Sequence, residues 1–261
     1  MKARDTMIFN NEPKDWRDLQ NKVCQVFLEM GCIAEVEKDI DTVRGKVNID
    51  VYVEDKKFTP EMTYLCECKF WNKPVSQNVV HSFQTVVNNA GANTGYIISK
   101  NGFQTGAVES ATSTNIVLLN WTQFQELLFN RWRKAMFKKA ENLSDNFMEY
   151  FDFLSGPPRD KDDNAELERL VKKYYIFMTV SPYLNLINSE KTIDFPIKCI
   201  DPRGNKYESK EISITNYRDL FEILNESYEA GIKAFTDFRA FLSAKHGDNT
   251  DYWSSITSKE I

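Results

Sequence analysis

The sequence has few glycine, proline, cysteine and histidine residues, and each shortage excludes a class of protein. Among 261 residues there are ten Gly and eight Pro, too few for a collagen-like or low-complexity chain. No apolar run reaches the roughly 18 residues that a membrane span needs, so we expect no membrane contact. Residues 1–5 lack the apolar segment of a secretory signal, and we therefore expect a cytoplasmic protein.

Cysteine is also scarce. The five Cys are an odd number scattered along a long chain, which favours reduced thiols over a disulfide framework. Cys66 and Cys68 are separated by a single residue, a spacing that suggests a zinc site. A structural zinc site needs a second pair of ligands, however, and the chain contains only two His. We therefore expect these two thiols to pack against a helix.

The charge is unevenly distributed. The formal net charge is -5, with a slight positive excess over residues 1–140 and a strongly acidic remainder. An acidic chain is not expected to coat nucleic acid through charge alone. It is compatible with an enzyme whose carboxylates hold metal ions while a local basic rim meets phosphate.

Apolar periodicity predicts an α/β fold for the first half. Apolar steps of three and four predict helices over residues 15–31, 76–90 and 103–113, and a long helix from Thr122. Short apolar or alternating runs predict strands over residues 32–38, 47–54, 62–70, 95–99 and 116–119. The order αβββαβαβ predicts an antiparallel meander joined to parallel strands by helical crossovers. We expect a mixed β-sheet with helices on both faces.

A segment rich in proline and charge divides the chain. Residues 155–164 read SGPPRDKDDN, a composition typical of a linker. We expect residues 1–154 to form the first domain with its trailing helix. Residues 165–261 are expected to form a smaller, acidic α+β domain for sensing or oligomerisation, whose aromatic run at 174–180 favours a core or a subunit interface.

Two neighbouring strands contain ionisable side chains among apolar ones. With period two, the strand at 47–54 directs four aliphatic side chains to one face and Asp50 to the other. In the next strand, Leu65, Glu67 and Lys69 share one face. If these strands are antiparallel neighbours, Asp50 meets Glu67 and Lys69.

This trio suits phosphodiester hydrolysis. The carboxylates of Asp50 and Glu67 can bind Mg²⁺ or Mn²⁺, with the backbone carbonyl of Cys68 as a further oxygen ligand. The metal acidifies a water molecule and neutralises charge on the phosphate. Lys69 can position or deprotonate that water, or stabilise the developing charge. The alternative is an ordinary cross-strand ion-pair cluster on a solvated sheet face.

Asp50, followed after sixteen residues by Glu67-Cys68-Lys69, resembles the PD-(D/E)xK nuclease signature, with Ile49 in place of the proline. The surroundings resemble an Mrr-type restriction endonuclease domain over about residues 14–130. The segments that carry this resemblance are the helix at 16–31, GKVNIDV at 45–51, CECKFW at 66–71, GYIIS at 95–99 and GFQTGA at 102–107.

The resemblance implies a restriction-endonuclease-like fold, a DNA substrate, a divalent metal and a role in defence against foreign or modified DNA. It also implies that Asp50, Glu67 and Lys69 are catalytic. Such domains often carry a glutamate on the first helix, about eleven residues before its closing glycine. Gln20 stands at that position here, which leaves Glu35 and Glu37 as the candidates for a third carboxylate.

Other residues are candidates for contact with nucleic acid. Arg44 and Lys46 flank the strand of Asp50, and Gln84 lies on the helix after Lys69. For each, a solvated surface position is the alternative. The same holds for a basic cluster on the long helix, where a solvated face is the preferred interpretation. Its members are Arg131, Arg133, Lys134, Lys138 and Lys139.

The sequence thus predicts a Mg²⁺-dependent endodeoxyribonuclease that acts as a homodimer or higher oligomer, with a fused or associated sensor component. The alternatives are a catalytically inactive nuclease-like module for binding or assembly, and an RNA-cleaving nuclease. A binding module would not need Asp50, Glu67 and Lys69 together, and would show no metal dependence.

Overall fold

The structure is a computed structural model that describes residues 7–148, 159–174, 176, 193–204 and 210–246. The chain divides into two compact units, Met1–Met136 and Phe137–Ile261. None of the helices in these described ranges is long and apolar enough to cross a membrane.

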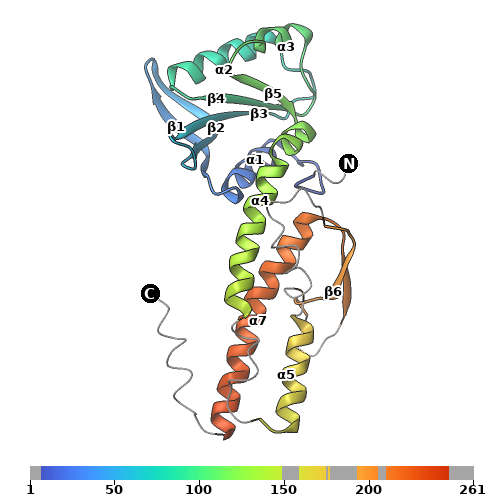
Figure 1. Cartoon of the computed structure of the whole chain (residues 1–261). Coiled ribbons are helices and arrows are strands. Elements are labelled where there is room, and N and C mark those ends of the chain that lie inside the picture. Colours follow the sequence, from blue (N-terminus) through green and yellow to red (C-terminus); the bar gives the residue numbers. More distant parts are fainter. Residues whose placement is uncertain (1–6, 149–158, 175, 177–192, 205–209, 247–261) are drawn as a thin grey trace. The chain divides into compact units, whose positions relative to one another are not determined.

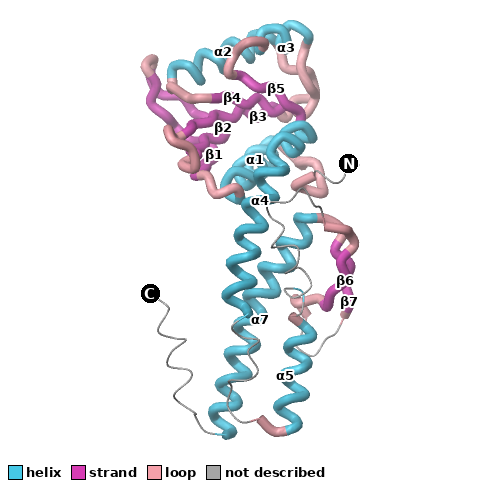
Figure 2. The backbone as a smooth tube through the Cα atoms, viewed as in Figure 1, coloured by secondary structure: helices cyan, strands magenta, loops and turns pink. Residues whose placement is uncertain are grey.

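A five-stranded mixed sheet forms the centre of the first unit (Figures 1 and 2). Its strands lie in chain order: β1 (Ile33–Thr42), β2 (Gly45–Asp55), β3 (Met62–Lys69), β4 (Thr94–Ser99) and β5 (Ile116–Asn120). The first three strands pair antiparallel, and β3, β4 and β5 pair parallel. The predicted mixed α/β fold is therefore confirmed.

Helices cover both faces of this sheet (Figure 1). The helix α1 (Trp16–Glu29) and the start of α4 (Trp121–Met148) lie on one face, where Phe27 contacts the rings of Tyr64 and Phe124 at 6.1 and 6.0 Å. The helices α2 (Gln77–Asn89) and α3 (Thr105–Ala111) lie on the other face. The side chain of Asp15 caps α1 by accepting a hydrogen bond from the backbone N–H of Asp18, and Gly31 follows the helix with φ 81°.

The core beneath α2 positions the strands that contain the candidate site. Its fully buried members include Leu65 on β3, Ile97 on β4 and Val87 on α2. Gly95 lets the helix approach closely, because a Cβ atom there would lie 2.6 Å from Val87 and 2.8 Å from Phe83. Such overlap would force the helix away from the sheet.

The second unit contains the end of α4 with α5 (Lys161–Lys173), the antiparallel strands β6 (Ile197–Ile200) and β7 (Glu211–Ile214), and α7 (Tyr217–His246). Phe147 packs against the rings of Tyr174 and Phe235 at 6.5 and 5.8 Å. Residues 155–158 of the predicted linker lie outside the described residues. Its last four residues, 161–164, begin α5. Most of the aromatic run at 174–180 also lies outside the described residues.

Candidate active site

The strand β3 places Glu67 and Lys69 on the sheet face that α2 covers. In the parallel register Glu67 lies beside Ile97 and Lys69 beside Ser99, and Ile97 belongs to the core under α2. The ammonium of Lys69 forms an ion pair with the Oε1 atom of Glu67. Their side chains are 17% and 22% exposed, so the pair is screened from bulk water and yet accessible.

Asp50 joins this pair through the backbone of β3. Its Oδ2 atom accepts a hydrogen bond from the N–H of Cys68 at 2.7 Å. The paired register of β2 and β3 ends just before this point, at Val51 and Cys66. A side-chain carboxylate thus takes the place of a main-chain acceptor and is fixed beside Glu67.

The two carboxylates affect each other electrostatically. Burial raises the pKa of Glu67, and the nearby charge of Asp50 raises it further, while Lys69 acts in the opposite direction. The net shift is upward because burial and Asp50 together outweigh Lys69, and a cation bound at the carboxylates would favour the ionised form of Glu67.

The strand β2 does not alternate strictly, contrary to the sequence prediction. Ile49 and Tyr52 both pack against the core under α2, which strict alternation of faces forbids. The irregularity extends to β1, where Glu37 adopts the left-handed conformation with φ 50°. Val36 pairs with Val51 and Lys38 with Ile49, so Glu37 lies across from Asp50. The expected alternation of faces therefore breaks between Ile49 and Tyr52, the stretch of β2 that contains Asp50.

The structure also places Gln20, which stands at the position of the family's glutamate, and the two glutamates considered in its place. Glu35 lies across from Tyr52 and its carboxylate contacts the ammonium of Lys38 at 3.2 Å. Gln20 is buried on α1. Of the two glutamates, Glu37 is therefore the one opposite Asp50 on the neighbouring strand.

A cavity of about 400 Å³ adjoins Glu67 and Lys69. Four polar or aromatic side chains that the sequence reasoning missed also line it: Asn48 on β2, Trp71, just after β3, and Asn78 and Ser82 on α2. Asn78 and Ser82 lie four residues apart and so share one helix face, a spacing visible in the sequence. Gln84 is on the same helix but is not among the residues that line the cavity.

The other candidate contacts with nucleic acid lie elsewhere. Arg44 is exposed in the turn between β1 and β2, where its backbone N–H donates to the hydroxyl of Thr42 at 3.2 Å. Lys46 is exposed on β2, across from Asp41. Arg131 forms an ion pair with the fully buried carboxylate of Asp55, so it has a partner within the fold.

Cys66 and Cys68 are buried, and burial raises the pKa of both thiols well above the ordinary value. Both thiols are therefore protonated at neutral pH in the metal-free protein.

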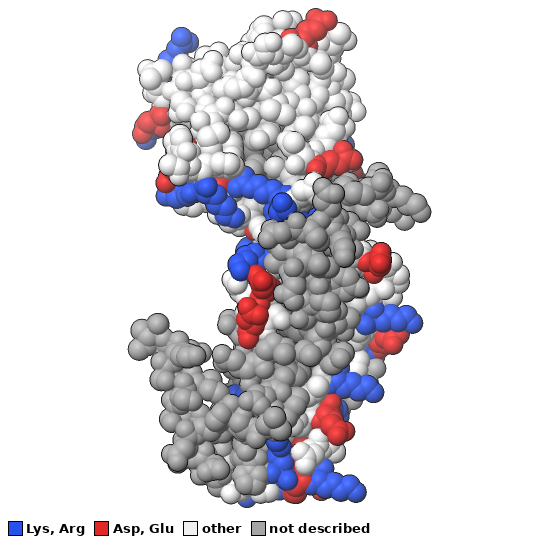
Figure 3. Space-filling view, in the orientation of Figure 1, with Lys and Arg blue, Asp and Glu red and all other residues white. Residues whose placement is uncertain are grey.

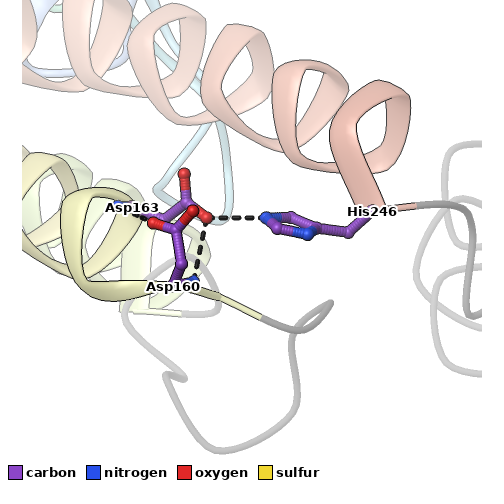
Figure 4. Close-up of side chains that lie close together, drawn as sticks. All are labelled: Asp160, Asp163 and His246. Atoms are coloured by element: carbon purple, nitrogen blue, oxygen red, sulfur yellow. Dashed lines mark hydrogen bonds and ion pairs between the residues drawn. The ribbon is translucent and has the colours of Figure 1, made fainter.

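A second cluster of possible ligands lies in the second unit (Figure 4). Within the described ranges, Asp160, Asp163 and His246 are the group of three such side chains whose ligand atoms lie within 4.8 Å of one another. Their oxygens already have partners, because Lys245 contacts both carboxylates at 2.7 and 2.8 Å and His246 contacts Asp163 at 2.7 Å. The hydrogen bond from Lys245 holds the pKa of Asp163 well below its usual range. This cluster therefore connects α5 to α7 through the ion pairs of Lys245 and the contact of His246 with Asp163.

Figure 3 shows few charged side chains on much of the visible face of the first unit, with Lys and Arg gathered along one border.

A larger cavity, of about 740 Å³, lies in the second unit between α5 and β6, and its walls include the apolar side chains of Leu167, Val171 and Ile200. Both cavities contain a carboxylate paired with a lysine, but Lys198 and Glu211 of the larger one are mostly exposed, whereas Lys69 and Glu67 are mostly buried.

Residues 13–128 match the family Mrr_cat, described as restriction endonuclease. Among solved structures, the chain is similar to the crystal structure of a protein of unknown function, AF1548, with 16% identity and a TM-score of 0.36 over 66% of this chain and 93% of that one. It is also similar to the DNA modification-dependent restriction endonuclease AspBHI, with 10% identity and a TM-score of 0.28 over 46% of this chain and 36% of that one. Both TM-scores are below 0.5. No curated protein matches the chain.

Proposed function

We propose that the Mrr-type restriction endonuclease domain formed by residues 13–128 is a metal-dependent endonuclease that hydrolyses phosphodiester bonds of DNA. Its catalytic residues are Asp50, Glu67 and Lys69. The proposal rests on two contacts observed together. Glu67 forms an ion pair with Lys69, and Asp50 accepts a hydrogen bond from the backbone N–H of Cys68. A cluster that holds like charges close together at a partly open cavity is typical of a functional site.

The donor set of this site fits a hard divalent cation. Asp50 and Glu67 provide carboxylate oxygens, and Cys68, the residue after Glu67, offers a backbone carbonyl oxygen. Burial, and then the charge of Asp50, raise the pKa of Glu67, and a bound cation would stabilise its ionised carboxylate. When bound, Mg²⁺ or Mn²⁺ supplies charge neutralisation at the phosphate and a more acidic water molecule.

The protein's own groups have separate tasks. Asp50 is fixed by the N–H of Cys68, so its remaining oxygen has a defined position for a ligand. Lys69 lies beside Glu67 and over the ring of Trp71 at 5.1 Å, which holds its ammonium near the cavity. There it positions the attacking water or stabilises charge on the scissile phosphate.

The test is incubation of the purified chain with plasmid DNA, linear DNA and RNA, each with Mg²⁺, Mn²⁺ or a chelator. We expect DNA cleavage that needs the metal and that Asp50→Asn removes while the protein remains folded. Cleavage of RNA alone would redirect the proposal to a ribonuclease. Binding of DNA without any metal-dependent cleavage would indicate a nuclease-like binding module.

The proposal extends to a biological setting. A cytoplasmic endonuclease of this kind would act in defence against foreign DNA, and the acidic second unit would serve oligomerisation or sensing. Cutting both strands requires two active sites or two successive events, and dimers are the commonest assembly. Light scattering is expected to show a dimer or larger species, and a monomer that cuts both strands in one event would contradict this.

A further inference from the structure

The cavity beside Glu67 and Lys69 has a lining that the hydrolytic residues alone do not explain. Its apolar part comes from β2 and α2, and includes Ile49, Val79 and Phe83. To these it adds a large aromatic side chain, Trp71, and two hydrogen-bonding side chains on α2. Apolar walls with a few convergent polar groups are typical of a ligand-binding site.

Trp71 is a large aromatic residue exposed to solvent at the end of β3. It lies two residues after the strand and is 38% exposed. Two ammonium groups lie over its ring, that of Lys69 at 5.1 Å from the centroid and that of Lys73 at 5.8 Å. The indole provides a stacking surface, and the two neighbouring ammonium groups attract a negatively charged group of the same ligand.

The helix α2 provides the polar side of the cavity. Asn78 and Ser82 are both exposed and lie one turn apart on the face toward the cavity. An asparagine amide both donates and accepts hydrogen bonds, and so does a serine hydroxyl. These groups can therefore pair with the polar edge of a planar heterocycle, whichever base it belongs to.

We propose that this cavity binds one unpaired nucleotide of the DNA strand. Its base stacks on Trp71 with its polar edge toward Asn78 and Ser82, and its phosphate lies beside Lys69. A cavity of about 400 Å³ has room for a single nucleotide and not for a base pair. This inference rests on the proposed function, and it adds that the enzyme prefers single strands, bulges or flaps over a perfect duplex, because a paired base must first leave the stack.

The test measures binding in chelator, so that it does not depend on hydrolysis. Fluorescence anisotropy is recorded with a labelled single-stranded oligonucleotide, the same sequence as a duplex, and a duplex with one bulged nucleotide. We expect the wild type to bind the single strand and the bulge at least about tenfold more tightly than the duplex. Trp71→Ala should weaken binding of the single strand and the bulge by about tenfold to a hundredfold, the range for loss of one stacked base, and so remove the preference over the duplex, while Trp71→Phe retains most of it.

The chain offers a matched control in Trp16, which is 47% exposed on α1 and has the guanidinium of Arg17 4.9 Å from its ring centroid. Trp16→Ala is expected to bind all three oligonucleotides as the wild type does. Ser82→Trp, at an exposed helix position, fills the cavity while Trp71 itself is kept, and should also remove the preference.

Equal affinity of the wild type for single strand and duplex would overturn the inference. So would a Trp71→Ala protein that keeps the wild-type preference, or one that loses duplex and single-strand binding alike. Failure of the wild type to cleave any DNA with metal present would contradict the proposed function instead, and would leave the binding result to decide on the cavity.

Discussion

The carboxylate of Asp50 accepts a hydrogen bond from the backbone N–H of Cys68, at 2.7 Å, between the two residues that contribute the other charges of the site. Glu67 precedes Cys68 and Lys69 follows it, so this bond fixes three ionisable groups relative to a single stretch of strand. The geometry is set by the backbone before any ligand arrives, which is the arrangement that catalysis by preorganised charge requires.

Glu67 is expected to oppose folding at neutral pH. Because its pKa is raised in the folded protein, the folded state binds more protons than the unfolded state above the ordinary value of 4.5, and stability falls as the pH rises. Glu67→Gln should therefore be as stable as the wild type or more stable at pH 7, with the difference shrinking toward pH 4. Urea unfolding across this pH range measures it. A variant that is much less stable at pH 7 would show that the ion pair with Lys69 dominates.

Metal binding at the site should raise the melting temperature of the wild type. A ligand that binds only the folded state at 100 times its Kd stabilises by about 2.7 kcal/mol. We expect Mn²⁺ to raise the melting temperature, a chelator to reverse this, and Asp50→Asn or Glu67→Gln to abolish it. Asp163→Asn, in the ion-pair cluster of the second unit, is the control and should keep the response. Loss of the response in Asp163→Asn alone would place the metal in the second unit.

Lys69 should be needed for turnover and not for metal affinity. Lys69→Ala is expected to lower the cleavage rate by about 10²–10⁴-fold, the usual contribution of a positioned acid–base group, while calorimetry still detects Mn²⁺ binding. Lys69→Arg keeps the ion pair, but its fixed fork and high pKa make it a poor base, and we expect little recovery. If Lys69→Arg cleaves at the parental rate, Lys69 does not transfer a proton, and its role is limited to supplying positive charge.

Arg131 is expected to stabilise the fold rather than bind DNA. Its ion-pair partner, Asp55, is fully buried, so Arg131→Met leaves a buried carboxylate without its cation. Breaking a buried pair in this way costs about 3 kcal/mol or more, here toward the lower value because Arg131 is itself partly exposed. Guanidinium unfolding should show this loss. Lys134→Met, at an exposed position on the same helix, should change stability little, and wild-type stability in Arg131→Met would contradict the structural role.

The order of helices and strands in the first unit could be predicted because its apolar periodicities are strong and consistent. The pairing of Glu67 with Lys69 on one face follows from period two in a regular strand, and the structure brings the two side chains into contact. The irregularity around Asp50 could not be predicted, because the left-handed Glu37 leaves no mark in an alternating pattern.

Residues around the cavity were harder to identify from sequence. Trp71 reads as one more aromatic at the end of a strand, and its exposure depends on how α2 packs against the sheet. Asn78 and Ser82 share a helix face that a helical wheel shows, but only the tertiary structure reveals that this face borders Glu67. Such positions depend on packing between elements, which the sequence of either element alone does not specify.

The most direct test of the hydrolytic site is single-turnover cleavage of an end-labelled DNA by the wild type and by Glu67→Gln, purified in parallel and checked for identical folding by circular dichroism. We expect the wild type to cleave the DNA with Mg²⁺ and not with chelator. We expect Glu67→Gln to lose cleavage, and added Mg²⁺ not to restore it. Equal cleavage by the two proteins, or cleavage by the wild type that persists in chelator, would contradict these expectations.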